Sequence, residues 1–552
     1  MASGYAASST DMSRHFTRGL SGSVCPLLIA IVAVLEAFSV ARAANPSIVV
    51  NIKTGASTTV PLAPGFSGLN APQPKNGVEY YDPKIIAAVS QLKPGWLRFP
   101  GGTASMAFDW NPANPTGGHI NIAWMNSLVE GNPPLVAGQP ANILTSSQQL
   151  TQAKGGVYLS DFATFAQTLG ANAIICFNSF TDNNPDSATQ MVQAAQNLGL
   201  NVVEWELGNE AYLYPTIYPT PGSNQANPVM YASDSYNPYY VNITAAAPTA
   251  RVGLFSAGLY TGSPQAVSNW DPQLSGYSAP YWNAASTHIY PITQAASTQT
   301  VMQELNGILE NGSSTYITSY LLPFVGANTP IYVTEFNSGL PYNNKFLTYL
   351  YNGIFLAEYI ARLSTVPNVK AVGVHAMYTD NSDYHGLVQS VDDYESYLLA
   401  QVAANPNFST DTATDPNTPF QFYISAPGLA VAVANQAINN SSAVWSTSVS
   451  AGLTVTTSGF GGLPMPAIFA QGYQANDGSH YLLVTNKSGQ GQDIIVEING
   501  TKVSGTMNLT YVANNSATAA NTATAQNTVQ IQTGTSSNPI FVHPYSVTCI
   551  QW

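Results

Sequence analysis

The chain has 552 residues, enough for roughly two to four domains or for one large barrel with an attached domain. Hydrophobic residues make up 45% of it, which allows a large core and excludes global disorder. Charged residues make up only 8%, and 15 Lys and Arg face 28 Asp and Glu, for a net charge of −13. A chain this poor in cations cannot line a polyanion, which argues against binding of nucleic acid or of sulfated polymers.

Residues 1–43 have the pattern of an export signal. Two arginines precede an apolar stretch at 24–40, and Ala41-Arg42-Ala43 forms the small-x-small pattern of a cleavage site. An uncleaved membrane anchor is the alternative, but the stretch is shorter than the roughly 20 residues of a membrane span, and Glu36 interrupts it. We therefore expect a secreted or periplasmic protein with no membrane attachment after signal removal.

Residues 62–439 alternate short β-branched runs with longer segments of helical periodicity. Eight strands with helical crossovers predict an α/β fold, a (β/α)8 TIM barrel with long loops. An open doubly wound sheet is the alternative, and the lack of a glycine-rich phosphate loop after the first strand disfavours it. The expected strands are 65–70, 95–99, 173–178, 202–207, 251–256, 285–289, 331–335 and 369–375, and the expected helices are 83–92, 160–169, 187–198, 301–310 and 345–363.

Residues 440–552 show alternating runs in place of helical periodicity, which predicts an antiparallel β-sandwich domain. The strand-like segment 44–61 is expected to join this sandwich and so to tie the two ends of the chain together. Beyond residue 43 the cysteines are Cys176 and Cys549, in different expected domains, so we expect two buried free thiols rather than a disulfide. The expected sandwich strands are 481–485, 493–498, 507–512, 529–532 and 546–551.

Two of the expected barrel strands end in a carboxylate. The run Val-Glu-Trp-Glu-Leu leads into Gly208-Asn209-Glu210, and the run Ile-Tyr-Val-Thr ends at Glu335. By count these are the fourth and seventh strands, and residues just past the carboxyl ends of barrel strands face the active site. A single Glu at a strand end is more often a cap or a surface ion pair. Two of them on one barrel face indicate catalysis.

Such a pair is what cleavage of a glycosidic bond requires. One carboxyl group protonates the leaving oxygen, and the other attacks the anomeric carbon or activates water; a separation of about 5–5.5 Å goes with attack and retention. Asn209 would offer its amide to a substrate hydroxyl. His288, His375 and His385 lack the spacing of metal ligands, and no Ser-His-Asp elbow or phosphate loop occurs, so we expect neither a metal nor a cofactor.

Three motifs carry a resemblance to a known group of enzymes. Gly208-Asn209-Glu210 and Thr334-Glu335-Phe336-Asn337 resemble the acid/base and nucleophile motifs of clan A retaining glycoside hydrolases. The run from Leu97 to Gly102, L-R-F-P-G-G, resembles the second-strand motif of family 79, with β-glucuronidases and heparanase, and of family 51, the α-L-arabinofuranosidases. The phrase from Gly208 to Tyr214 is closer to family 79. The resemblance covers most of the chain in architecture but only these short motifs in sequence.

The resemblance implies retention through a covalent glycosyl-enzyme, with Glu210 as acid/base and Glu335 as nucleophile. It also implies a tyrosine near the end of the sixth strand that hydrogen-bonds the nucleophile. His288 and Tyr290 both stand at this place, and we favour Tyr290. The alternative is a core histidine and a loop tyrosine without a part in catalysis.

Three further residues are candidates for the site. Arg98 ends the second strand, and a buried Arg beside the nucleophile would keep Glu335 ionised. A structural ion pair within the barrel is the alternative for Arg98, and the two roles can coincide. Asn337 and Tyr342 follow the nucleophile on its loop and are candidates for binding the far end of the substrate.

We therefore expect an exported retaining glycoside hydrolase, exo-acting and β-glucuronidase-like, whose partner is a carbohydrate and not a nucleic acid. An α-L-arabinofuranosidase is the first alternative. Heparanase-like cleavage of a sulfated chain is a second one, disfavoured by the few cations. A carbohydrate-binding protein that kept the fold and lost catalysis is a third, disfavoured by the presence of both Glu210 and Glu335. The oligomeric state does not follow from the sequence.

Overall fold

The computed structural model describes most of the chain beyond residue 45. The described residues are 46–71, 80–102, 105–106, 108–110, 119–120, 158–179, 182, 184–215, 218–223, 225–260, 270–274, 276–277, 281–292, 297–311, 314–379, 383–391, 404, 421–458 and 463–552. The expected signal peptide, residues 1–43, lies outside them. Residues 46–552 form one compact unit.

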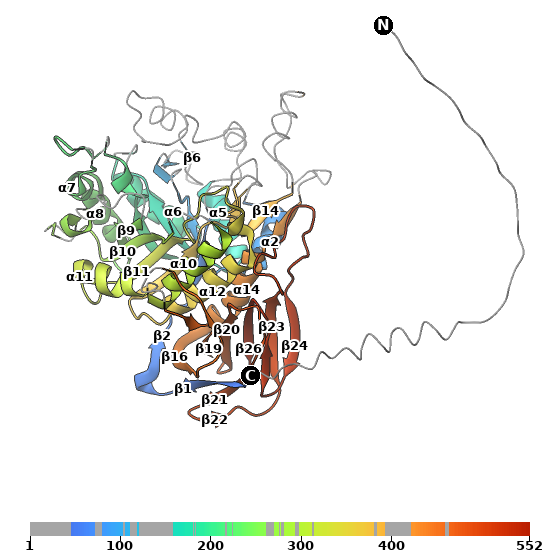
Figure 1. The fold of residues 1–552 in the computed structure, drawn as a ribbon. Coiled ribbons are helices and arrows are strands. Elements are labelled where there is room, and N and C mark those ends of the chain that lie inside the picture. Colours follow the sequence, from blue (N-terminus) through green and yellow to red (C-terminus); the bar gives the residue numbers. More distant parts are fainter. Residues whose placement is uncertain are drawn as a thin grey trace, which may run out of the picture. The chain divides into compact units, whose positions relative to one another are not determined.

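Within the described residues, eight parallel strands close into a barrel (Figure 1). Each strand pairs with the next barrel strand along the chain, and the eighth pairs with the first. The expected (β/α)8 barrel is therefore confirmed, with each strand within a few residues of its expected place. The strands are β3 (Ser67–Asn70), β4 (Trp96–Phe99), β7 (Asn172–Phe177), β8 (Val202–Leu207), β9 (Val252–Tyr260), β10 (Ala284–Tyr290), β11 (Ile331–Phe336) and β12 (Val369–Val374).

Helices follow the barrel strands as the periodicity predicted, except that the expected helix 345–363 divides at Tyr349 into a short 3-10 helix, Lys345–Thr348, and α12. The first of them shows the local reasons: Pro83 stands in its first turn, the Asp82 side chain accepts the Lys84 N–H at 2.8 Å, and its apolar face is buried. The main helices are α2 (Pro83–Ser90), α5 (Leu159–Thr168), α6 (Asp186–Asn197), α7 (Pro228–Met230), α8 (Asn237–Ala246), α10 (Thr298–Asn311), α11 (Leu322–Val325), α12 (Leu350–Leu363) and α14 (Ala426–Ile438).

Trp96 fills the amino-terminal part of the barrel interior. Its ring lies where a side chain at Gly68 or Gly373 would stand, since a Cβ there would come within 2.3 Å and 2.2 Å of ring atoms. Glycine on β3 and on β12, the two strands next to β4 on one side in the barrel, thus makes room for the indole. Because this part is plugged, chemistry is left to the opposite, carboxyl end of the strands.

The C-terminal part is a β-rich domain, as expected, with an eleven-stranded sheet among the described residues. The sheet folds over a core of its own, in which Ile48 and Val50 of one layer pack with Leu482 and Ile550 of the other. Its pairs are antiparallel except β1 with β21. The strands are β1 (Ile48–Lys53), β2 (Thr59–Pro61), β16 (Ser441–Val449), β19 (Ile468–Ala475), β20 (His480–Asn486), β21 (Gln492–Ile498), β22 (Thr501–Lys502), β23 (Met507–Ala513), β24 (Gln532–Ser536), β25 (Ile540–Val542) and β26 (Ser546–Gln551).

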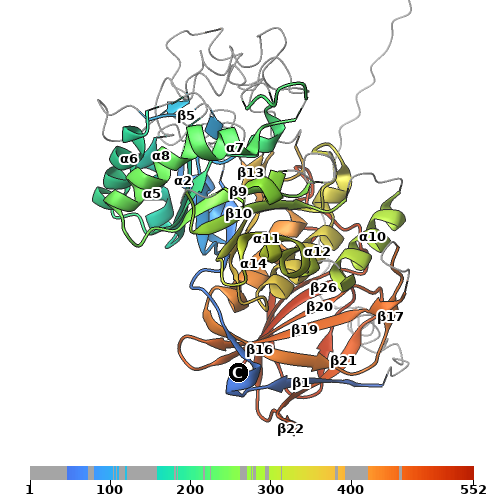
Figure 2. The same cartoon turned by 90° about the vertical axis from the view of Figure 1, so that its left-hand side faces the viewer.

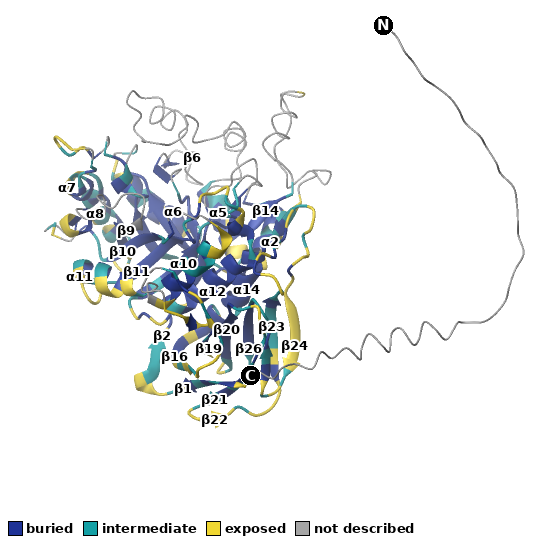
Figure 3. Ribbon diagram, in the orientation of Figure 1, coloured by how far each residue is buried: buried dark blue, intermediate teal, exposed yellow. Residues whose placement is uncertain are grey.

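This region differs from the expectation in several places, and four of its strands, β16, β19, β22 and β25, were not expected. A strand was expected at 529–532, but β24 starts only at Gln532. The amide of Asn521 binds both backbone groups of Val529 and so holds that residue in a turn. The helix α14 was not expected at all, because it is apolar on every side and lacks a helical stripe. All its residues except Gln436 are buried, as its dark colour in Figure 3 shows.

The helices α12 and α14 lie between the barrel and the sheet domain (Figures 1 and 2). A buried ion network crosses this junction. Glu358 of α12 contacts Lys487, just after β20, at 2.5 Å, and both side chains are fully buried. Thr485 donates to the same Glu358 oxygen as Lys487, Oε2, at 2.6 Å, and Arg362 contacts the other oxygen, Oε1, at 2.8 Å.

Cys176 and Cys549 are both buried and free, as expected. No helix in the described part of the chain is long and apolar enough to cross a bilayer.

Candidate active site

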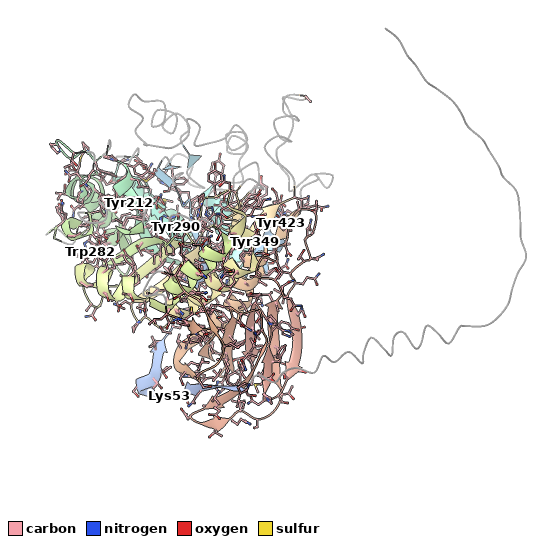
Figure 4. All side chains as sticks on the ribbon, viewed as in Figure 1. Lys53, Tyr212, Trp282, Tyr290, Tyr349 and Tyr423 are labelled. Atoms are coloured by element: carbon pink, nitrogen blue, oxygen red, sulfur yellow. The ribbon has the colours of Figure 1, made fainter. Side chains whose placement is uncertain are left out.

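The polar residues at the carboxyl ends of the barrel strands converge on one site. They come from six of the eight strands, which is why residues far apart in sequence meet there. Figure 4 labels Tyr212 and Tyr290 in this part of the barrel. The residues are Asn70 of β3, Arg98 of β4, Asn209 and Glu210 after β8, His288 and Tyr290 of β10, Glu335 of β11, and His375 after β12.

The backbone turns sharply between the fourth strand and Glu210. Gly208 has a φ of +80°, and a Cβ there would lie 2.4 Å from the Tyr236 hydroxyl, so only glycine fits. Glu210 itself has a φ of +46°, in the left-handed region that residues with a side chain rarely adopt. Strain of this kind is held by the surrounding structure and concentrates at functional sites.

Glu335 is held as a carboxylate by three donors. Arg98 Nη1 donates to its Oε1 at 2.6 Å, Asn70 Nδ2 donates to the same oxygen at 2.7 Å, and the Tyr290 hydroxyl donates to Oε2 at 2.7 Å. Burial alone would raise the pKa of Glu335. The nearby His288, His375 and Arg98 outweigh it and lower the pKa to about 2. Glu335 is therefore ionised at neutral pH, as a nucleophile must be.

Arg98 has both roles that the sequence left open. It is fully buried and forms a structural ion pair with Glu206 at 2.5 Å, and it also contacts Glu335. Burial alone would lower the pKa of Arg98, but the two carboxylates outweigh it and the pKa is raised. The guanidinium is therefore charged at any pH at which the chain is folded.

Glu210 has a different environment. Its side chain is 15% exposed, and its Oε1 lies 3.0 Å from His288 Nδ1 and accepts from the Tyr212 hydroxyl at 3.1 Å. No arginine or lysine pairs with it among the described residues. Glu335 is thus paired with a buried cation, while the side chain of Glu210 is partly exposed in the site.

The two carboxylates are close together. His288 Nδ1 lies 3.0 Å from Glu210 Oε1 and 3.5 Å from Glu335 Oε2. Because both oxygens lie near one nitrogen, they are no more than about 6.5 Å apart, whereas inverting glycosidases need about 6.5–9.5 Å between the carboxyl groups to admit a water. The geometry therefore suits direct attack by one carboxylate better than activation of water between them.

The other expected site residues differ in their burial and in their distance from the two carboxyl groups. Asn209 is buried, and its side-chain oxygen accepts from Arg98 at 2.9 Å. Asn337 is buried away from the carboxylates: its amide donates to the His375 carbonyl at 2.5 Å and its oxygen accepts the Ser338 N–H. Tyr342 lies on the surface, 60% exposed. Of the two candidates at the sixth strand, Tyr290 reaches Glu335, and His288 links both carboxylates.

Sequence reasoning missed Asn70, Glu206 and His375. Asn70 Nδ2 contacts both Glu335 Oε1 and, at 2.9 Å, His375 Nδ1. Since an amide N–H2 group only donates, this contact is a hydrogen bond in the His375 tautomer that accepts at Nδ1 and carries its proton on Nε2. The signal was available: Asn70 and His375 stand where the first and eighth strands end, the same place that singled out the two glutamates.

Acid is expected to weaken the fold through Glu335. Its pKa is about 2 in the folded chain and about 4.3 for a free glutamate, so the folded state binds fewer protons between these values. The resulting stabilisation, about 3 kcal/mol, is complete above roughly pH 4.5 and is lost as the pH falls toward 2. Urea unfolding between about pH 6 and 3 measures it.

Glu335→Gln is the control, because it removes the titrating group and should flatten the pH dependence of unfolding in that window. The lowered pKa of Glu358 acts in the same direction and remains in both proteins as a common background. An equally steep dependence in wild type and variant would assign the effect to other carboxyl groups.

Other hollows in the described structure lack this chemistry. A cavity of about 850 Å³ lies between α2 and residues 421–424 and 526–531, and one of about 370 Å³ lies at the amino ends of the barrel strands. Neither is lined by Asp or Glu. Among the described residues, no group of three or more His, Cys, Asp and Glu is arranged to hold a metal ion.

The sequence matches no protein-family model and no curated protein. Solved structures do match in fold. An α-L-arabinofuranosidase from Thermotoga maritima covers 92% of this chain and 100% of its own, with 14% identity and a TM-score of 0.59. A family 51 α-L-arabinofuranosidase from Bifidobacterium longum covers 91% and 99%, with 12% identity and a TM-score of 0.62. A 4-O-α-L-rhamnosyl-β-D-glucuronidase from Fusarium oxysporum covers 92% and 100%, with 13% identity and a TM-score of 0.52. At these identities the likeness establishes the fold: this chain has the barrel and β-rich domain of these structures.

Proposed function

We propose that the chain is a retaining glycoside hydrolase. The observation that carries the proposal is that two carboxyl groups in different environments lie near the same imidazole, that of His288. Glu335 is ionised and paired with Arg98, whereas Glu210 is partly exposed. The Glu210 oxygen and the Glu335 oxygen that lie nearest to His288 are no more than about 6.5 Å apart. The fold comparisons agree with this proposal, since the matching structures named above are two arabinofuranosidases and a glucuronidase.

The reaction follows from the two environments. Glu335 attacks the anomeric carbon while Glu210 gives its proton to the leaving oxygen, so the glycosidic bond breaks as the glycosyl-enzyme ester forms. Glu210, now a carboxylate, then takes a proton from water, and the hydroxide displaces Glu335. Two inversions at the same carbon retain its configuration. Tyr290 and Asn70 donate to Glu335 when it is charged and so favour its release in the second step.

For the sugar, we propose a terminal β-D-glucuronide. The motif resemblance to family 79 supports it, and so do the histidines that gather at Glu335. His375 lies 3.8 Å from Glu335 Oε2, and its ring lies 5.5 Å from that of His385. The Ser338 N–H on the loop after β11 is already bound to Asn337, which leaves fewer backbone donors there for a carboxylate. Imidazole N–H groups are the donors that remain near the nucleophile.

An α-L-arabinofuranoside is the second candidate. It is favoured by the fold comparisons, in which the arabinofuranosidases have TM-scores of 0.59 and 0.62 against 0.52 for the glucuronidase. It is also compatible with Arg98, whose charge is already taken up by Glu206 and Glu335 and is not available to a substrate carboxylate.

A panel of 4-nitrophenyl glycosides tests both the retaining mechanism and the choice of sugar. We expect hydrolysis of the β-D-glucuronide, with the β-D-glucoside slower by about 5- to 30-fold, because neutral donors distinguish a carboxylate from a hydroxymethyl group by roughly 1–2 kcal/mol. NMR of the first-formed sugar should show the β anomer. Turnover of the α-L-arabinofuranoside alone would move the choice of sugar to the second candidate. An inverted anomer would remove the retaining mechanism, and no turnover of any glycoside would favour a carbohydrate-binding protein without catalysis.

A further inference from the structure

Glu206 is a buried carboxylate that the reaction above does not use. It lies in β8, four residues before Glu210, and is fully buried. Its Oε2 accepts from Nε of Arg98 at 2.5 Å and lies 2.5 Å from Nη2 of the same guanidinium. Its Oε1 accepts from the Thr334 hydroxyl at 2.6 Å. Both oxygens of Glu206 are thus held, one by β4 and one by β11.

Arg98 distributes its remaining N–H groups to two residues of the site. Nη1 donates to Glu335 Oε1 at 2.6 Å, and Nη2 donates to the side-chain oxygen of Asn209 at 2.9 Å. A guanidinium is planar, and its donors have fixed directions. Once Glu206 sets the plane of Arg98, it also sets where the other two bonds point.

The bond from Arg98 also orients the amide of Asn209. The amide oxygen faces the cation, so the N–H2 group on the other branch of the planar amide is directed away from it. That group is the one that can donate to a sugar hydroxyl beside the anomeric carbon. The same guanidinium therefore aligns the carboxylate that attacks and the amide that holds the sugar.

We infer that Glu206 is a positioning residue of the active site: through Arg98 it aligns both Glu335 for attack and Asn209 for recognition of the adjacent sugar hydroxyl. This inference rests on the proposed function for its catalytic consequence. Its structural part, the alignment of Arg98, stands by itself. The competing reading is that Glu206 only balances a buried charge and that any change in the barrel interior would have the same effect.

Glu204 offers a matched control for that reading. It lies two residues earlier on the same strand, is fully buried, and accepts from Ser286 at 2.6 Å. Burial and the neighbouring Glu206 raise its pKa well above the usual value. Glu204→Gln therefore changes a buried carboxyl group of the same strand while keeping the shape of the side chain, and no hydrogen bond to Arg98 is lost.

The first experiment observes Arg98 directly and does not depend on activity. The sequence has six arginines, three of them in residues 46–552. In the full chain labelled with ¹⁵N at the arginine Nε, the signal of Arg98, assigned with Arg98→Lys, should lie apart from the others and exchange slowly with water. We expect Glu206→Gln to shift this signal and speed its exchange by at least about tenfold, and Glu204→Gln to leave it in place. An unchanged signal in Glu206→Gln would overturn the inference.

The second experiment measures the catalytic consequence on the aryl glycoside that wild type hydrolyses. We expect Glu206→Gln to lower kcat by roughly 10²-fold with KM changed by less than about threefold, because a small misalignment of reacting groups costs rate rather than binding. The preference for the substrate over its 2-deoxy analogue should also fall, since Asn209 loses its orientation. Glu204→Gln should retain wild-type kcat and the wild-type preference.

A milder variant covers the case in which Glu206→Gln does not fold. Thr334→Val removes only the hydrogen bond to Glu206 Oε1, and it should give a smaller shift of the Arg98 signal and a drop in kcat of about tenfold. Equal losses of kcat in the Glu204 and Glu206 variants would show an effect of the barrel interior in general and reject the positioning role. If wild type hydrolyses no glycoside, the proposed function fails, while the Arg98 signal still decides whether Glu206 aligns the guanidinium.

Discussion

Glu335→Gln is expected to abolish hydrolysis of every glycoside, with kcat lowered by more than about 10⁴-fold. The amide cannot form the glycosyl ester, and the neighbouring carboxylate of Glu206 cannot take its place, because it is buried and bound to Arg98 and Thr334. Initial rates with an aryl glycoside measure the loss. The circular dichroism spectrum should stay native, since Gln keeps the size of the side chain.

Glu210→Ala should behave differently in the same assay. Removing the proton donor is expected to lower kcat by roughly 10²–10⁴-fold on substrates with poor leaving groups and by much less with dinitrophenolate, which leaves without protonation. Azide should restore turnover, because the small anion enters the space left by the side chain and attacks the glycosyl-enzyme to give a β-glycosyl azide. Rescue of the Glu335 variant and not of the Glu210 variant to the β product would reverse the two roles.

Lys487→Met is expected to destabilise the fold by about 3–5 kcal/mol. Lys487 and Glu358 contact each other at 2.5 Å where both side chains are fully buried, between α12 and the sheet domain. Removing the lysine leaves the Glu358 carboxylate buried with Arg362 as its remaining cation, and an incompletely paired buried charge is costly. The free energy of unfolding in urea measures the effect.

Two variants give this prediction its controls. Lys502→Met removes an exposed lysine of β22 and should change the free energy of unfolding by less than about 0.5 kcal/mol. The double variant Glu358→Leu with Lys487→Met should recover most of the lost stability, because two apolar side chains then replace the pair. A double variant as unstable as Lys487→Met would mean that the loss of stability comes from altered packing and not from the incompletely paired charge of Glu358.

The architecture was accessible from the sequence because its determinants are local. Alternating and helical periodicity act over a few residues, and they located every strand of the barrel and, in the sheet domain, β20, β21, β23 and β26, but not β16, β19, β22 or β25. Where the local signal was missing, the prediction failed. The helix α14 is apolar on all sides because it is buried on all sides, so it has no stripe to recognise.

The candidate site was accessible in part for the same reason. A carboxylate at the end of a strand is a local pattern, and counting strands placed Glu210 and Glu335 on one face of a barrel. The pattern does not say what each residue touches. Asn337 stands two residues after Glu335 in sequence, yet its side chain is bound to the backbone around His375, while Asn70, 265 residues away, donates directly to Glu335.

By itself, therefore, the sequence determined the fold class of this protein and the two carboxylates on which its proposed chemistry depends. Only the tertiary structure decided how they differ. Glu335 is ionised because Arg98, 237 residues away, contacts it where water is excluded, whereas Glu210 pairs with no such cation in the described part of the chain and lies at the partly exposed edge of the site. The physical reason is that a carboxyl group's charge state depends on burial and on neighbours within a few ångströms, and in a closed barrel those neighbours come from strands that are far apart in the chain.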